Sequence, residues 1–285
     1  MKVLILGPKA RYDAYAPDFL SQLPVEPVFC PIDQSPLQAA AANPDTRALL
    51  VDAITPVDAQ LMDLLPRLEL IHSEGVAFNR IDLEAARARG IYVCNNKGCN
   101  AASVAEHTVM LMLMALRHGV TGHRAVREGR QIQMKEQVMV SDAPELGVTY
   151  LPLEELAARC DILSLHCAVN DKTRHLVDDA LLAHIKRGAI LVNTARGELV
   201  DDLAVRRALI DGRLGAIAVD TLFPEPTPAD HPLVDLPPEV ADRAVYSPHL
   251  GGITGGSFRR AHRNMWNSVR LVMEGHRPNF IVNGL

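Results

Sequence analysis

Short runs of apolar residues alternate with amphipathic stretches along most of the chain. The apolar runs are typical of buried strands and lie at residues 2–6, 25–30, 47–51, 68–73, 91–95, 161–167, 188–194 and 215–221. Helix-like stretches lie between them, at 35–42, 58–65, 82–90, 153–160, 178–185 and 201–212. Because strands that alternate with helices pair in parallel, the pattern predicts an α/β fold with two doubly wound parallel sheets.

Three further segments complete the pattern. Residues 101–129 predict one long helix that is apolar nearly all round between Val104 and Leu116, and that is therefore buried between layers, domains or subunits. Residues 224–248 hold seven prolines and predict an irregular surface connection. A closing helix is predicted over 257–274, and the basic cluster at 257–263 is interpreted as its solvent-exposed face.

Composition narrows the class of protein. With 285 residues, of which 48% are hydrophobic, the chain can build two domains with cores of their own. A net charge of −5 argues against a general nucleic-acid surface, and no apolar run is long enough to span a membrane. The five scattered cysteines form no metal-binding spacing, and an odd set favours a reduced cytoplasmic location over a disulfide framework. We expect no metal site.

Three candidates for chemistry follow predicted strands in the second half of the chain: Arg196 in "NTARGEL", Glu225 in "DTLFPEP" and His249 in "SPHLGG". Open parallel sheets bind ligands at the edge where the carboxyl ends of the strands meet. A guanidinium can hold the carboxylate and carbonyl oxygen of a 2-oxo acid, and an imidazolium favoured by a nearby carboxylate can supply a proton as hydride arrives. Taken alone, each of these three residues is explained equally well as part of a solvated strand end or loop. His107 and His166 are better explained by packing or hydrogen bonding than by acid catalysis. The joint arrangement indicates reduction of a 2-oxo acid.

With these residues the chain resembles the D-isomer-specific 2-hydroxyacid dehydrogenases, which include glyoxylate, hydroxypyruvate and phosphoglycerate dehydrogenases. The matching stretches, among them "SEGVAFNRIDLEAARARGIYVCNN", "GAILVNTARGELVDD" and "SPHLGG", cover most of residues 71–252. The interval of 29 residues from Arg196 to Glu225 is the one that this family shows. A formate dehydrogenase of the same superfamily is disfavoured, because there a glutamine matches Glu225.

The resemblance implies hydride transfer between NAD, with NADP as the alternative, and a small D-2-hydroxy acid or 2-oxo acid, in a homodimer. It implies a flavodoxin-like substrate-binding domain, residues 1–99 plus 262–285, and a Rossmann-type nucleotide-binding domain, residues 100–261. Arg196 would bind substrate, His249 would be the acid/base and Glu225 would polarise His249. Backbone N–H groups at Gly75 and Val76 would bind the substrate carboxylate, with Ala77 standing where a glycine is common. The implied cofactor-cleft residues are Thr194, Ala195, Arg196, Asp220, His249, Gly251 and Gly252.

The family pattern breaks at one place. The G-x-G-x-x-G turn that faces a cofactor pyrophosphate is missing, because none of the 18 glycines lie two positions apart. The nucleotide domain is about 30 residues short near Val140–Ser141, which is the size of a strand–turn–helix–strand unit. The acidic residue that would select NAD over NADP is expected within this missing unit. Either the printed sequence omits residues that the molecule has, or the polypeptide lacks them. Loss of central strands would expose apolar faces, which favours omission. A true loss favours the alternative function, a non-catalytic binding or regulatory protein on the same scaffold.

Overall fold

The chain forms two compact units, each with its own parallel sheet. The computed structural model describes residues 1–30, 34–130, 132–134 and 149–285. Unit 1 comprises Met1–Ala102 and Ile253–Leu285, and unit 2 comprises Ser103–Gly252. Two parallel sheets confirm the predicted α/β class. The predicted shortfall at Val140–Ser141 lies outside the described residues.

Unit 1 is built on five parallel strands in the order β2-β1-β3-β4-β5, the flavodoxin-like order. The strands are β1 (Lys2–Leu6), β2 (Glu26–Phe29), β3 (Ala48–Val51), β4 (Leu70–Ser73) and β5 (Tyr92–Cys94). The helices are α1 (Lys9–Ala14), the 3-10 helix η1 (Asp18–Gln22), α2 (Pro36–Ala41), α3 (Ala59–Asp63), α4 (Leu83–Ala88) and α12 (Gly255–Met273). Asp58 and Asp82 cap α3 and α4 through side-chain oxygens that accept backbone N–H groups, a usual signal for a helix start.

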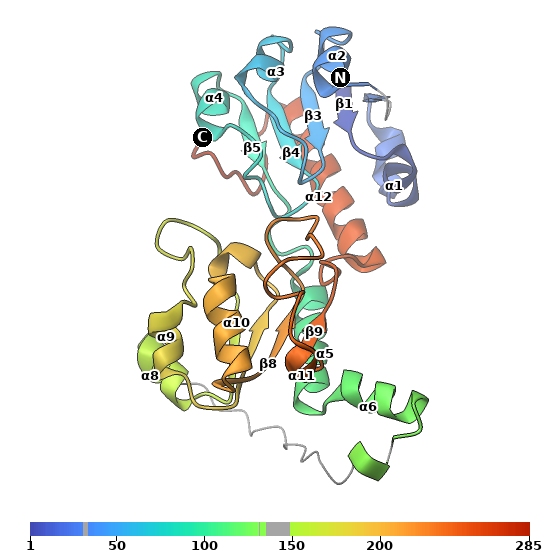
Figure 1. Ribbon diagram of the computed structural model, residues 1–285. Helices are drawn as coiled ribbons and strands as arrows, with labels where there is room; N and C mark the ends of the chain where they lie inside the picture. Colours follow the sequence, from blue (N-terminus) through green and yellow to red (C-terminus); the bar gives the residue numbers. More distant parts are fainter. Residues whose placement is uncertain (31–33, 131, 135–148) are drawn as a thin grey trace. The chain divides into compact units, whose positions relative to one another are not determined.

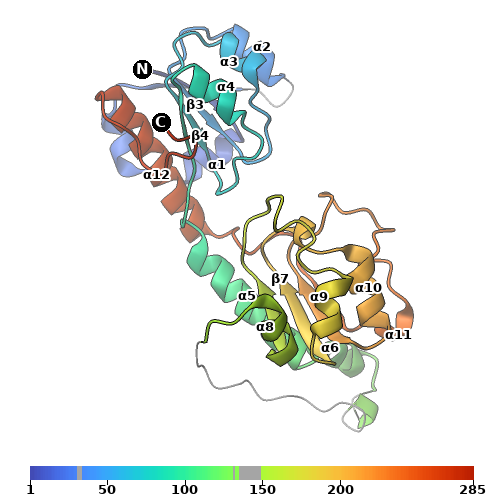
Figure 2. The same cartoon turned by 90° about the vertical axis from the view of Figure 1, so that its left-hand side faces the viewer.

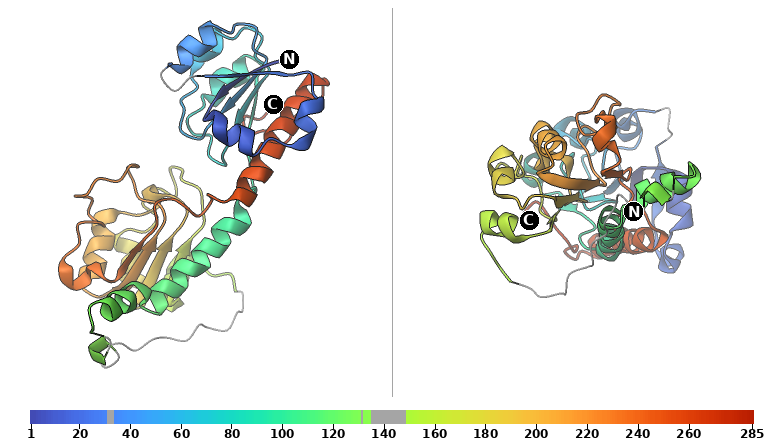
Figure 3. Two further views of the ribbon diagram at one scale, coloured as in Figure 1. Left: turned by 90° about the vertical axis from the view of Figure 1, so that its right-hand side faces the viewer. Right: turned by 60° about the horizontal axis from the view of Figure 1, so that its bottom comes forward.

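Alternating side chains give unit 1 a core on each face of its sheet. Along β1, Leu4 and Leu6 join the apolar cluster that includes α2, α3 and α4, whereas Val3 and Ile5 join the cluster that includes α12. This alternation is the period-two pattern of a strand that is buried on both faces. Figures 1 and 3 show α12 lying along one face of this sheet.

Unit 2 is built on four parallel strands in the order β6-β7-β8-β9. The strands are β6 (Ile162–Leu165), β7 (Ala189–Asn193), β8 (Leu214–Val219) and β9 (Ala244–Tyr246). The helices are α5 (Ala101–Leu116), which begins in unit 1, α6 (Gly119–Arg127), α8 (Leu153–Arg159), α9 (Asp179–His184), the 3-10 helix η2 (Gly197–Leu199), α10 (Asp202–Ile210) and α11 (Pro238–Ala241). Within the described ranges, no strand pairs with the outer side of β6.

The second sheet also separates its helices into two layers. Leu191 of β7 packs in the cluster of α8, α9 and α10, whereas Val192 packs in the cluster of α5. Figure 2 shows α5 and the α8–α10 group on opposite faces of this sheet. Asp201 caps α10 and Gly212 follows its end at a φ of 74°, a left-handed backbone that glycine adopts without strain.

The eight predicted strands are present, with ends that shift by up to two residues. Two predictions of secondary structure were wrong. The predicted single helix over 101–129 is two helices, because His118 takes a left-handed conformation at φ 50° and redirects the chain between α5 and α6. The proline-rich segment 224–248 is not wholly irregular, since it contains α11 and β9. Proline is tolerated in the first turn of α11, and β9 itself holds no proline.

The apolar helix over 104–116 is only partly covered. In α5, Thr108, Leu111 and Ala115 are buried, whereas Val109 and Leu113 remain 54% and 46% exposed. The described residues therefore do not bury this helix all round as expected, because the sheet covers one side of it. No helix in the described part is long and apolar enough to cross a membrane.

Candidate functional site

The candidate residues of unit 2 follow three neighbouring strands. Because β7, β8 and β9 are adjacent and parallel, their carboxyl ends lie at one edge of the sheet. Arg196 comes three residues after β7, Asp220 directly follows β8, and His249 comes three residues after β9. The topology thus brings these residues to the edge at which open parallel sheets bind ligands.

Glu225 and His249 are in direct contact. His249 Nδ1 lies 3.0 Å from Glu225 Oε1 and 2.9 Å from Oε2. A carboxylate can only accept, so the contact requires a proton on Nδ1. Nε2 of His249 has no partner within the described ranges, and the side chain is 45% exposed. The ring therefore presents one nitrogen outward while a carboxylate holds the other.

Gly197 allows the loop of Arg196 to pack against the loop that leads to Glu225. A Cβ at residue 197 would lie 2.4 Å from the backbone nitrogen of Phe223 and 2.5 Å from the carbonyl carbon of Leu222. Only glycine permits this approach. The half-buried Arg196 donates from Nη1 to the carbonyl of Ala195 at 2.7 Å. Among the described residues, no contact joins its guanidinium to Glu225 or His249.

Asp220 holds the bend that carries His249. Its two carboxylate oxygens accept the N–H groups of Leu250 and Gly251, each at 2.9 Å, and its carbonyl accepts the N–H of His249 at 2.8 Å. A Cβ at residue 251 would lie 2.9 Å from Asp220 Oδ2, so the bend needs glycine there. His107 of α5 lies 3.2 Å from Asp220 Oδ1.

Two hydrogen bonds tie α5 to the same edge. His107 Nε2 lies 2.9 Å from the hydroxyl of Ser247, and the hydroxyls of Thr108 and Thr194 lie 2.9 Å apart. His107 thus has the hydrogen-bonding role expected for it. Sequence reasoning missed Ser247 and Thr108, and their only signal is proximity to His249 and His107 along the chain. Gly252 follows the bend and is the last residue of unit 2.

The expected carboxylate-binding backbone lies in unit 1, directly after β4. A Cβ at Gly75 would lie 3.0 Å from Cβ of Ala53, which explains the glycine at this position. Ala77 has no positive φ, so the alanine fits this turn without backbone strain.

In the turn over residues 73–77, all five carbonyl groups are paired, whereas two N–H groups have no partner among the described residues. Every one of its five carbonyls accepts a hydrogen bond from within unit 1. The donors are Asn96 Nδ2 to Ser73 and Glu74 at 3.2 and 2.9 Å, the Asn96 N–H to Gly75 at 2.9 Å, Asn95 Nδ2 to Val76 at 2.7 Å, and Ser73 Oγ to Ala77 at 2.7 Å. The N–H groups of Val76 and Ala77 have no partner in the described part of the chain. Unpaired backbone N–H groups in a turn are able to bind a carboxylate or another anion.

A buried ionic cluster beside this turn was missed by sequence analysis. Glu74 contacts Arg11 of α1 and His262 of α12, which are 63 and 188 residues away along the chain. His262 is fully buried, so the interpretation of 257–263 as a solvent-exposed face was wrong for this residue. No local pattern could have paired these residues. Burial also lowers the pKa of nearby His72 to about 4, so this ring adds no charge near neutral pH.

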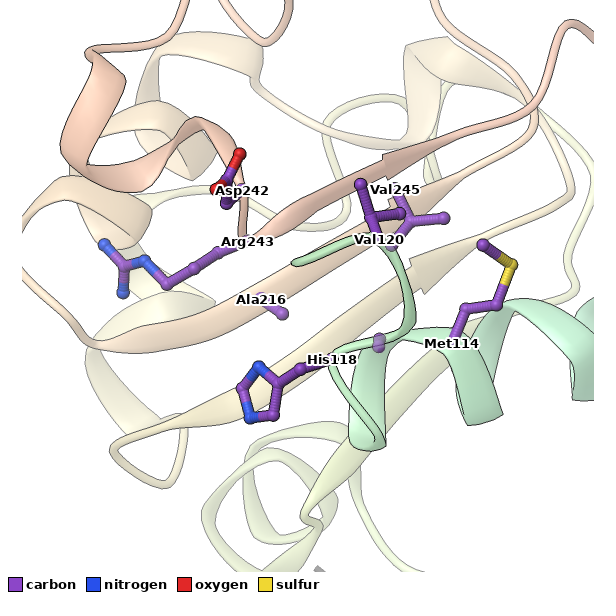
Figure 4. A pocket seen from close by; sticks show the side chains of 8 residues that line it. Met114, His118, Val120, Ala216, Asp242, Arg243 and Val245 are labelled. Carbon is purple, nitrogen blue, oxygen red and sulfur yellow. The ribbon is translucent and has the colours of Figure 1, made fainter. Parts of the chain in front are cut away.

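A small cavity lies at the opposite edge of the second sheet. It encloses about 10 Å³, enough for about one water molecule. Figure 4 shows the residues that line it, including His118 at the helix break and Arg243 directly before β9. β8 and β9 begin at this edge, so the cavity is remote from the strand ends that carry Arg196 and His249. It is too small for an organic substrate.

Comparison with known proteins identifies relatives for both units. Residues 133–251 match the family model described as the D-isomer-specific 2-hydroxyacid dehydrogenase, NAD binding domain. A D-3-phosphoglycerate dehydrogenase of Mycobacterium bovis is 33% identical over 273 aligned positions, which cover 82% of this chain and 51% of the relative. This chain therefore spans about half the length of that curated relative. A glyoxylate reductase of Korarchaeum cryptofilum is 28% identical over 84% of this chain and 83% of its own length.

The fold has a close structural counterpart. The D-lactate dehydrogenase of Aquifex aeolicus, solved with NAD and lactic acid, superimposes with a TM-score of 0.78 at 21% identity and covers 96% of each chain.

The relatives are also longer within the aligned span. Since 82% of 285 residues is about 234, about 39 of the 273 positions aligned with the mycobacterial protein face a gap in this chain. This difference is close to the shortfall expected from the absent glycine-rich turn.

Proposed function

Because this chain belongs to the D-isomer-specific 2-hydroxyacid dehydrogenase family, we propose that it transfers hydride between a nicotinamide cofactor and a small D-2-hydroxy acid or its 2-oxo acid. The proposed cofactor is NAD, with NADP as the alternative. The proposed working direction is reduction of the 2-oxo acid.

The contact between Glu225 and His249 carries this proposal. Reduction of a carbonyl needs a proton donor beside the oxygen that becomes an alkoxide. His249 has the geometry of such a donor, because Glu225 engages Nδ1 at 2.9 and 3.0 Å and leaves Nε2 open. Glu225 stabilises the imidazolium before the transfer and holds the ring in place after it.

Arg196 has the complementary role of anchoring the substrate. Its planar guanidinium can hold the carboxylate and the carbonyl oxygen of a 2-oxo acid together, and a cation beside the carbonyl oxygen stabilises negative charge that develops there. Supported by the contact between Gly197 and the Leu222–Phe223 backbone, the arginine loop and the glutamate loop form one wall of the site. The nicotinamide, when bound, supplies the hydride.

The described residues fit the nicotinamide end of the cofactor. Asp220 is buried, and its Oδ2 accepts one backbone N–H group and has capacity for a second donor, such as a carboxamide. Thr194, Ala195, Gly251 and Gly252 supply a backbone wall at the same edge. The phosphate end lacks the glycine-rich anchor of the family, since the chain contains no G-x-G.

We assign substrate binding to unit 1 and nucleotide binding to unit 2. In unit 1, the N–H of Val76 has no partner among the described residues, which supports its role in holding the substrate carboxylate. The N–H of Gly75 already donates to Ser73 Oγ at 3.3 Å, so Gly75 would have to release that bond to bind the carboxylate. The match of residues 133–251 to an NAD-binding domain supports the assignment of unit 2.

The proposal is tested by the loss of NADH absorbance with glyoxylate, hydroxypyruvate and pyruvate. We expect turnover of at least one, near-complete loss in Arg196→Ala and a large loss in His249→Ala. Circular dichroism of each variant controls for folding. A folded protein that turns over nothing on this panel would contradict the proposal.

A second candidate function is a non-catalytic binding or regulatory protein on the same scaffold. The absent glycine-rich turn and the gap of about 39 positions favour it. Calorimetric titration with NADH separates the two functions, because a protein that binds no dinucleotide cannot be the dehydrogenase.

We extend the proposal to a homodimer in the cytoplasm. Val109, Met110 and Leu113 expose apolar surface on α5, and a second copy of the chain would remove it from water. Cys94, Cys99, Cys160 and Cys167 are free thiols, which supports a reducing compartment.

A further inference from the structure

Among the ion pairs described in unit 1, Glu74 is the most deeply buried carboxylate. Its side chain is 5% exposed, whereas the acidic partners in the other pairs are 42–64% exposed. Arg11 Nε lies 2.8 Å from Oε1, Arg11 Nη2 contacts Oε2, and His262 Nε2 lies 2.8 Å from Oε1. Buried ion pairs add little net stability compared with apolar packing. The cluster therefore needs an explanation other than stability.

The strand pattern explains why Glu74 faces α12. Along β4, Leu70 packs in the cluster with α12 and Ile71 packs in the cluster on the other face. Alternation then places Glu74 on the α12 side, while its N–H continues the ladder to the carbonyl of Val51 at 2.7 Å. Glu74 is thus the last residue fixed by the sheet before the turn at Gly75.

We propose that Arg11, Glu74 and His262 form a positioning cluster for the anion-binding turn at Gly75 and Val76, in which Arg11 cancels the charge of Glu74. This inference rests on the proposed function, which assigns the substrate carboxylate to that turn. The side chain of Glu74 is clamped by α1 and α12, so the backbone that starts the turn is held in place. Without Arg11, an uncompensated carboxylate directly before the turn would repel an anionic substrate.

The charge argument predicts opposite effects for the two partners. A unit charge ~8 Å away, across an effective dielectric constant of ~40, changes the affinity for an anion about fivefold. Arg11→Gln should therefore raise KM for a 2-oxo acid about fivefold or more, with kcat changed by less than about twofold. Glu74→Gln leaves the cation uncompensated and should lower KM. The double variant Arg11→Gln/Glu74→Gln should have a KM close to that of the wild type. Arg11→Lys keeps the positive charge, so its KM should also stay close to that of the wild type.

The chain supplies a matched control at the other end of β4. Arg47 and Glu69 form an equivalent two-pronged pair at 2.8 and 2.9 Å. They directly precede β3 and β4, whereas Glu74 directly follows β4, so the control pair lies at the opposite edge of the sheet. Arg47→Gln and Glu69→Gln should leave KM unchanged. If Arg11→Gln and Glu74→Gln shift KM in the same direction, the cluster acts on the turn only through structure, and the proposed charge cancellation by Arg11 is refuted.

A binding measurement separates this inference from the proposed function. Trp266, the only tryptophan of the chain, lies one helical turn beyond His262 and is buried in the same core, so its fluorescence can report on the cluster. Oxamate, an unreactive 2-oxo acid analogue, is titrated with and without NADH. Weaker oxamate binding by Arg11→Gln and tighter binding by Glu74→Gln, in a protein without turnover, would uphold the cluster and overturn the proposed function. Turnover with equal oxamate affinity in both variants overturns the cluster alone. If the wild type shows neither turnover nor oxamate binding, both fail.

Discussion

Gly197→Ala is the substitution that most directly tests how the site is assembled. The added Cβ would lie 2.4 Å from the nitrogen of Phe223, 2.5 Å from the carbonyl carbon of Leu222 and 2.9 Å from Cβ of Phe223. No flexible side-chain end can yield here, because two of these atoms belong to the backbone. The loops of Arg196 and Glu225 must separate.

The size of the separation follows from these distances. Tolerable contacts of a Cβ begin near 3.4 Å, so the loops must move apart by about 1 Å. A displacement of about 1 Å in a catalytic arrangement can cost about 100-fold in rate. The overlap should also lower the free energy of unfolding by about 2 kcal/mol, as overpacking does, which corresponds to a fall of about 4–8 °C in Tm.

Gly215→Ala is the matched control. Its added Cβ would lie 2.4 Å from the carbonyl oxygen of Gly188, an equally severe overlap with backbone, but at the edge where β8 begins. We expect a similar loss of Tm with kcat within about threefold of wild type. Gly119→Ala, whose nearest heavy atom would be 3.5 Å away, should change neither quantity much.

The assay combines thermal unfolding with NADH oxidation by folded protein well below Tm. The reasoning is refuted if Gly197→Ala keeps wild-type kcat, or if Gly215→Ala loses as much activity as Gly197→Ala. Equal losses would mean that activity follows general stability and not the contact between the two loops.

Three other outcomes are expected. In steady-state kinetics, Glu225→Gln should lower kcat about 10- to 100-fold, because general acid catalysis is lost in part, and His249→Gln should lower it about 100- to 10,000-fold, because it is lost in full. Equal effects of the two substitutions would contradict the assignment of His249 as the acid and Glu225 as its support. Burial lowers the pKa of His72 to about 4, so this ring takes up a proton more readily in the unfolded chain. The free energy of unfolding of the wild type should therefore fall by about 2 kcal/mol from pH 6.5 to 5 through this group. Urea unfolding of His72→Leu should show a correspondingly weaker dependence of that free energy on pH. Leu113→Glu places a charge on the exposed face of α5 and should give monomers in analytical ultracentrifugation if wild type is a dimer, whereas an unchanged dimer would exclude this face as the interface.

Local pattern predicted the fold well because both sheets are coded by short-range signals. Alternating apolar runs located all eight expected strands, and their order along the chain placed Arg196 and Asp220 after consecutive strands. The break at His118 was missed although Arg117, His118 and Gly119, two basic residues followed by a glycine, are a usual signal for a helix end. A strand end was expected before His249, but the bounds of β9 were not predicted, because prolines dominate its surroundings, although "AVY" is itself an apolar run.

The sequence by itself determined the two parallel sheets, and it brought the candidate side chains to strand ends, because strand periodicity and helix caps act over a few residues. Only the tertiary structure decided which of these groups meet. Glu225 meets His249 across 24 residues, and Glu74 meets His262 across 188. Such contacts depend on how the elements pack, and packing of distant segments leaves no local trace in the chain.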